Sequence, residues 1–215
     1  NLTMMYGLEA VTVPSNLEVG LKEWSPQNIS IKTNPEAIIW AVDGVDDNSV
    51  AFAARLMEKG VEVRIIDKEA LLSKQTLSRG SVAVLAMDNP EYEDLSETVN
   101  SIASDLDISV LSIESGFGAE ELPDWGGRHF RLLERPQIAI LSQSGFSSYD
   151  VGVSWWSLDH HLGIRHSQID ASLVNYADLR RYNTIILPSG YRDMGEYEKK
   201  VLSDWMEQGG TLIAH

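Results

Sequence analysis

The chain is built from short runs rich in apolar residues, separated by segments with helical spacing, and this alternation limits the folds open to it. Four such runs occupy residues 37–42, 61–66, 81–86 and 108–113, and three more occupy residues 137–141, 184–188 and 211–214. A short run of this kind is typical of a strand covered on both faces. Strands that alternate with helices predict an α/β fold with parallel sheets, in Rossmann- or flavodoxin-like three-layer blocks.

The segments between these runs carry helix start and stop signals. Asn48 and Ser49 can cap a helix that Gly60 ends. In the second half of the chain, Asp150 is placed to cap a helix that Gly163 ends. Val151, Trp155, Leu158 and Leu162 share one stripe of that helix, which predicts its core-facing side; Trp156 would then point off it.

These signals divide the chain into two α/β domains. We expect a lead-in segment (1–35), a first α/β domain (36–115), a linker rich in Gly and Pro (116–136) and a second α/β domain (137–215). The last strand, 211–214, has no helix after it, so we expect the second domain to be truncated. The chain begins with Asn1 rather than Met, and we expect an N-terminal portion to precede it.

The composition disfavours two classes of partner. The 17 Lys and Arg residues stand against 32 Asp and Glu, which gives a formal net charge of −15. Binding to nucleic acid or to an anionic membrane requires cations, so neither is expected as a partner. Cysteine is absent, which removes disulfides, thiolate zinc sites and cysteine nucleophiles. No cofactor is expected within this chain.

Two loops are candidate binding sites, because each follows a predicted strand. The first contains Ser144, Gly145, Ser147 and Ser148 and leads into a helix, a geometry suited to an anion; a plain capped turn is the alternative. The second contains Ser189 and Gly190. A serine after a strand can be a hydrolase nucleophile, but Leu187 stands where that motif has Gly. Its base would have to be His166 or His215, oriented by a group such as Asp193.

The remaining polar clusters do not fit metal sites. The five histidines lack the spacing to a second His or Glu that zinc proteases show; they are His129, His160, His161, His166 and His215. An acidic group before a predicted helix lacks the alternation of a calcium loop and indicates a solvated helix start; it comprises Glu91, Glu93, Asp94 and Glu97.

The second domain resembles the class I glutamine amidotransferase-like domain that is appended to a subset of M14-family zinc carboxypeptidases. The resemblance is carried by residues 144–149 with Trp155 and Leu158, by 178–188, and by 205–214. The opening residues 1–5 look like the end of the peptidase domain in such proteins. Residues 79–81 before a strand match their intervening domain.

This resemblance implies a secreted or periplasmic parent protein in which zinc belongs to a peptidase domain that this chain lacks. True amidotransferases carry their nucleophilic Cys after the strand that corresponds to 211–214, where this chain has His215. The expected function is therefore a non-catalytic accessory region, with the N-terminal peptidase domain and a peptide substrate as partners. The alternatives are an independent small-ligand module using the two loops and, third, a serine hydrolase using Ser189.

Overall fold

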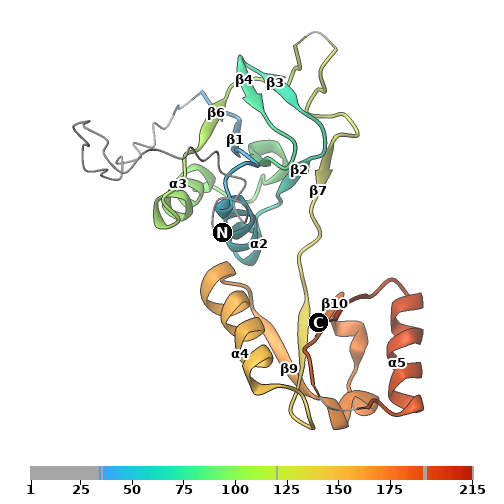
Figure 1. Cartoon of the computed structure of the whole chain (residues 1–215). Helices are drawn as coiled ribbons and strands as arrows, with labels where there is room; N and C mark the ends of the chain where they lie inside the picture. Colours follow the sequence, from blue (N-terminus) through green and yellow to red (C-terminus); the bar gives the residue numbers. More distant parts are fainter. Residues whose placement is uncertain (1–33, 35, 120, 191–192, 215) are drawn as a thin grey trace, which may run out of the picture.

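The computed structural model describes residues 34, 36–119, 121–190 and 193–214. Most of the predicted lead-in segment, as well as His215, lies outside these residues. The described chain forms two α/β lobes joined by an extended segment (Figure 1). The predicted α/β class is confirmed. Within the described residues, no helix combines the length and apolarity needed to cross a membrane.

The first lobe contains a five-stranded sheet in the order β6-β1-β5-β2-β7. Its strands are β1 (Ile39–Val42), β2 (Arg64–Ile66), β5 (Val82–Leu85), β6 (Leu111–Ile113) and β7 (Phe130–Leu132). Its helices are α2 (Asn48–Glu58) and α3 (Leu95–Asp105), with a short 3-10 turn, η1 (Ala86–Asp88), between β5 and α3. A separate hairpin pairs β3 (Ala70–Leu72) with β4 (Gln75–Leu77).

The parallel arrangement predicted for this first block is wrong, because all four strand pairings in its sheet are antiparallel. The cause lies in residues 67–80, which form a hairpin and contain no crossover helix. A strand that follows without a crossover returns antiparallel, so β5 enters the sheet between β1 and β2. The resulting order of β6, β1, β5 and β2 is that of a split β-α-β-β-α-β unit.

Both faces of the first sheet are covered, as the apolar runs predicted. Trp40 and Val42 face the helices and pack with Phe52 of α2 and Val99 of α3. The alternate residues, such as Ile39, face the other way and pack with the hairpin residues Leu72 and Leu77 and with Trp125 and Phe130. Trp125 and β7 lie within the predicted linker 116–136, so much of that segment belongs to the first lobe. The extended connection itself covers residues 133–137.

The second lobe contains a four-stranded sheet in the order β11-β10-β8-β9, and all its pairings are parallel. This confirms the parallel sheet predicted here. The strands are β8 (Ile138–Ser142), β9 (His166–Asp170), β10 (Thr184–Leu187) and β11 (Thr211–Ala214). The helices are α4 (Ser148–Trp156), which continues as a π-helical stretch, η2 (Ser157–Leu162), and α5 (Glu196–Glu207). Two 3-10 turns, η3 (Ala171–Tyr176) and η4 (Leu179–Arg181), connect β9 to β10.

Helices α4 and α5 lie on opposite faces of this sheet (Figure 1). Ile185 and Ile186 of β10 show why the strand is apolar throughout: Ile185 packs toward α5 and Ile186 toward α4 and η2. On the α5 face, the Trp205 indole N–H donates to the carbonyl oxygens of Leu179 at 3.1 Å and Tyr182 at 3.2 Å. This fixes α5 to the 3-10 turn that precedes β10.

The two lobes touch through the last turns of α2. Ala54 packs into the apolar cluster that α4 and η2 form with the second sheet. Nearby, Arg55 donates from Nη2 to the carbonyl oxygen of His161 at 3.2 Å. Glu58 accepts from Arg135 Nη2 at 3.0 Å and from Arg165 Nε at 2.7 Å. The junction therefore combines an apolar contact with an ionic cluster.

Candidate functional site

The two serine-containing loops predicted as candidate sites meet at the carboxyl edge of the second sheet. From β8 the chain crosses to β9 on one side, whereas β10 lies on the other side, so the strand order reverses between β8 and β10. Open parallel sheets bind ligands at such a reversal. Here the loops form a hollow of about 490 Å³ lined by Phe146, Ser147, Ser148, Tyr149, Ser189 and Gly190.

Backbone contacts hold the two loops together. Phe146 and Gly190 form an isolated antiparallel bridge, and the Ser147 N–H donates to the Ser189 carbonyl at 2.8 Å. A β-carbon on Gly190 would lie 2.6 Å from the Gly145 carbonyl oxygen, so only glycine fits this approach. The predicted residues Ser147, Ser148, Ser189 and Gly190 thus share one hollow.

The first loop has an unusual backbone before the helix begins. Gln143, Ser144 and Gly145 are three consecutive residues with positive φ, at 57°, 45° and 97°; non-glycine residues adopt this region rarely. The Ser144 hydroxyl donates to Asp170 Oδ1 at 2.7 Å, which ties the loop to the end of β9. Ser144 and Gly145 therefore shape the loop and do not line the hollow.

Helix α4 is capped one turn earlier than the sequence predicted. The N-cap is Ser147, whose Oγ accepts from the Asp150 N–H at 3.3 Å, and Asp150 lies in the first helical turn. Its carboxylate benefits from the positive end of the helix dipole. Asp150 accepts from Ser189 and Asp170 from Ser144, so a carboxylate contacts each serine loop.

Ser189 is not arranged as a nucleophile with His166, one of the two histidines considered as its base. Its hydroxyl donates to the Asp150 carboxylate, and none of the described histidines lines the hollow. His166 begins β9 and is in register with Ile138, at the amino edge of the sheet, whereas Ser189 follows the carboxyl end of β10. The hypothesis that His166 acts as the base for Ser189 is therefore wrong. His215 lies outside the described residues, and Asp193 is exposed.

The described histidines make local contacts. His129 Nδ1 lies 2.7 Å from Asp67 Oδ1, and this hydrogen bond holds the pKa of the Asp67 carboxyl below its ordinary value. The His160 ring lies against Trp156, with centroids 5.1 Å apart. Among the described residues, no group of three or more His, Asp or Glu side chains is placed to hold a metal ion.

The sequence prediction missed an exposed apolar stripe on α4. Tyr149, Val153 and Trp156 follow one another at spacings of four and three residues, and 85%, 65% and 51% of their surfaces are exposed. No residue of Ser148–Trp156 is buried. Trp155, predicted as part of the core stripe, is itself 42% exposed. The core contact on this side comes mainly from Leu158 in η2.

Comparison with known proteins does not place the chain in a family: no family model, no curated protein and no solved structure matches it.

Proposed function

We propose that this chain is a non-catalytic accessory module that docks onto a neighbouring protein domain through α4. The exposed stripe of Tyr149, Val153 and Trp156 supports this proposal most directly. A contiguous apolar patch on a protein surface commonly marks an interaction site, and Trp and Tyr are the residues that most often dominate binding energy at interfaces. The stacking of His160 on Trp156 holds one of these rings in place before a partner arrives.

The stripe continues into a second hollow, which gives a partner a place to insert a side chain. This hollow, of about 310 Å³, lies beside Val153 and is bounded by Leu158 and Ile186. Ile213 of β11 is in register with Ile186 and is 45% exposed, so the apolar surface extends toward the edge strand. A partner side chain entering here would contact both the helix and the sheet.

The charged residues beside the stripe indicate which kind of partner surface can bind it. Asp150 stands at one end of the stripe and the exposed Asp159 at the other, in a chain of net charge −15. Charges around an interface steer binding and select partners of opposite sign. The partner is therefore an apolar surface with a cationic rim. The resemblance of residues 144–214 to the domain appended to M14-family carboxypeptidases supports a zinc peptidase domain of the same secreted or periplasmic polypeptide as that partner.

The test begins with the sequence encoded before this chain, which should contain a peptidase domain with a His-x-x-Glu motif. Binding of that separately produced domain to this chain is then measured by calorimetry. Val153→Asp should weaken binding at least tenfold, because it places a charge in the apolar contact. The matched control is Val50→Asp, at a comparably exposed helical position, 60% exposed, in the first lobe. Equal effects of the two substitutions, or no peptidase domain upstream, would refute the proposal.

A second candidate function, a small-ligand module, is favoured by the convergence of the two loops on one hollow. The hollow offers the hydroxyl groups of three serines and an exposed tyrosine, a set that suits a hydrogen-bonding ligand. Titration with phosphate, nucleotides and short peptides, followed by amide chemical shifts of Ser147 and Gly190, separates the two functions. If none of these compounds shifts the loop amides, the ligand function is refuted. Lack of fluorophosphonate labelling at Ser189 would exclude hydrolase activity there.

A further inference from the structure

We propose that the amino edge of the second sheet is a binding site for a phosphate group. A hollow of about 290 Å³ opens here, on the opposite edge from the serine loops. Arg135, Arg165 and Arg181 line it together with His166 and Tyr182, and Glu58 of the first lobe reaches it from α2. It combines three guanidinium groups with one carboxylate, in a chain whose overall charge is strongly negative.

The topology of the sheet explains why these cations meet. Each arginine comes shortly before a different strand: Arg135 before β8, Arg165 before β9 and Arg181 before β10. The registers place Ile138 of β8 beside both His166 of β9 and Thr184 of β10. Because the strands are parallel, their amino ends share one edge, and residues far apart in sequence converge there.

The cations of this cluster are only partly balanced by ion pairs with the described residues. Glu58 is shared by Arg135 and Arg165, and Arg181 has no ion-pair partner within the described part of the chain. Three guanidinium groups and one carboxylate leave two positive charges when His166 is neutral. The other lysines and arginines in the described part of the second lobe are paired: Arg180 with Asp178, Lys199 with Glu196 and Lys200 with Asp204.

The guanidinium N–H groups of Arg165 and Arg181 suit a tetrahedral anion. Arg165 contacts Glu58 through Nε, and its side chain is 78% exposed, so its terminal nitrogens remain available. Arg181 lies with its guanidinium carbon 5.9 Å from the Tyr182 ring centre, which limits its freedom. Guanidinium groups bind phosphate oxygens in paired hydrogen bonds. A phosphate group at neutral pH carries about 1.5 to 2 negative charges, which is close to the excess of positive charge in the hollow.

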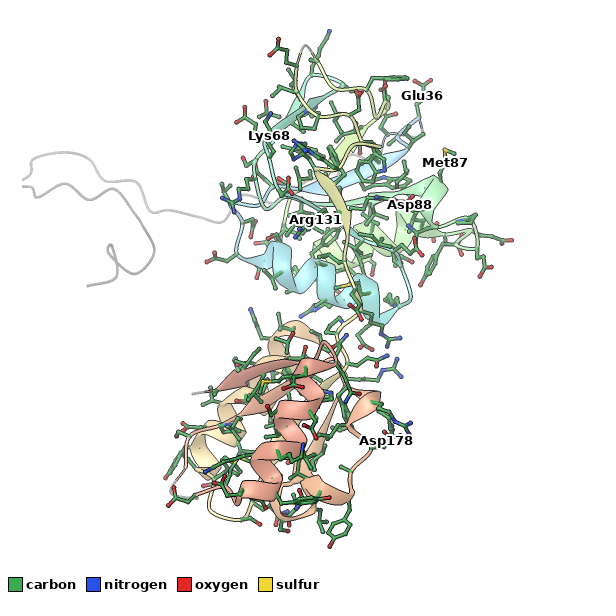
Figure 2. The ribbon with its side chains drawn as sticks, turned by 90° about the vertical axis from the view of Figure 1, so that its right-hand side faces the viewer. Glu36, Lys68, Met87, Asp88, Arg131 and Asp178 are labelled. Atoms are coloured by element: carbon green, nitrogen blue, oxygen red, sulfur yellow. The ribbon has the colours of Figure 1, made fainter. Side chains whose placement is uncertain are left out.

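The experiment is calorimetric titration of the chain with inorganic phosphate at fixed ionic strength, because salt screens exposed charges. Arg181→Gln should weaken binding about tenfold by removing an unpaired donor. The matched control is Arg180→Gln, which removes the neighbouring arginine, outside the hollow. Asp178, its partner, projects from the surface of the second lobe in Figure 2. Both arginines are exposed in η4, so neither substitution disturbs the core.

Competition by sulfate and by acetate tests whether the hollow selects an anion by its charge. Sulfate should compete with phosphate, whereas acetate, with one charge, should compete at least tenfold less well. The proposal is overturned by the absence of saturable phosphate binding at millimolar concentration, by equal losses in the two arginine variants, or by acetate competing as well as sulfate. None of these results bears on docking through α4, which Val153 tests separately.

Discussion

Glu58→Gln is the substitution that most directly tests how the two lobes are held together. The Glu58 side chain is only 14% exposed, and its Oε2 accepts from Arg135 at 3.0 Å and Arg165 at 2.7 Å. Glutamine keeps the size of the side chain but removes its charge. The two guanidinium groups would then face each other without a carboxylate between them.

The expected loss of stability follows from the solvent exposure of Arg135 and Arg165, the two partners of Glu58. Arg135 is 44% exposed and Arg165 is 78% exposed, so each ion pair is partly screened by solvent. Exposed pairs of this kind contribute about 0.2–1 kcal/mol each. We therefore expect Glu58→Gln to lower the free energy of unfolding by about 1 kcal/mol at neutral pH. The apolar contact of Ala54 with the second lobe remains, so the lobes stay associated.

The loss of stability caused by Glu58→Gln should depend on pH. Burial alone would raise the pKa of Glu58, but the hydrogen bonds from Arg165 and Arg135, together with their positive charges, lower it below its ordinary value. A carboxyl whose pKa is lowered on folding stabilises the folded state above its unfolded pKa, which is about 4.3 for Glu. That stabilisation is lost as the pH falls through the folded pKa. The two proteins should therefore differ fully at pH 7 and converge in acid.

Urea unfolding followed by tryptophan fluorescence at pH 7 and at about pH 3 measures the free energy of unfolding of each variant and its dependence on pH. The matched control is Glu36→Gln, which changes an exposed carboxylate on the first lobe, labelled in Figure 2; it should leave stability unchanged at either pH. The reasoning is refuted if Glu58→Gln has the stability of the native sequence at pH 7. It is equally refuted if the loss is undiminished in acid.

Three further substitutions test the second lobe. Gly210→Ala would place a β-carbon 2.3 Å from Cε2 of the Trp205 ring; it should cost about 1–3 kcal/mol of stability by overpacking, seen in thermal denaturation. Trp205→Phe should cost about 1–2 kcal/mol in urea unfolding, because the carbonyl oxygens of Leu179 and Tyr182 lose their indole donor. Gly190→Ala should separate the two serine loops, so hydrogen exchange of the Ser147 amide should become at least tenfold faster; an unchanged rate would contradict the close approach.

The strands of the second lobe could be predicted because local and tertiary requirements agree there. Each run is apolar on both sides, and helices cover both sides, as Ile185 and Ile186 show. In the first lobe the positions of the strands were predictable but their direction was not. Direction depends on whether residues 67–80 form a crossover or a hairpin, and the positive φ angles of Ser73 and Lys74 that turn this hairpin give little signal in the sequence.

The candidate site was partly predictable for a topological reason. Ser147 and Ser189 follow strands of one parallel sheet, so their loops had to lie at the same edge. The α4 stripe was missed because the helix is apolar on more than one side, and spacing alone does not tell which side the core covers. The arginine cluster was missed although its signal was present: a cation shortly before each of three successive strands, at Arg135, Arg165 and Arg181.

The serine hollow and the arginine hollow lie at opposite ends of the same strands, and this makes their tests independent. Strand β8 has five residues between them, a rise of about 13 Å, and effects of substitutions separated by more than about 7–10 Å usually add. Arg181→Gln and Gly190→Ala should therefore add in stability. Helix α4 with η2 is the element that spans both edges, because it begins beside Ser147 and ends where Arg55 meets His161. A partner bound along α4 would thus contact both ends of the sheet, and any coupling between the two hollows should arise only when that partner is present.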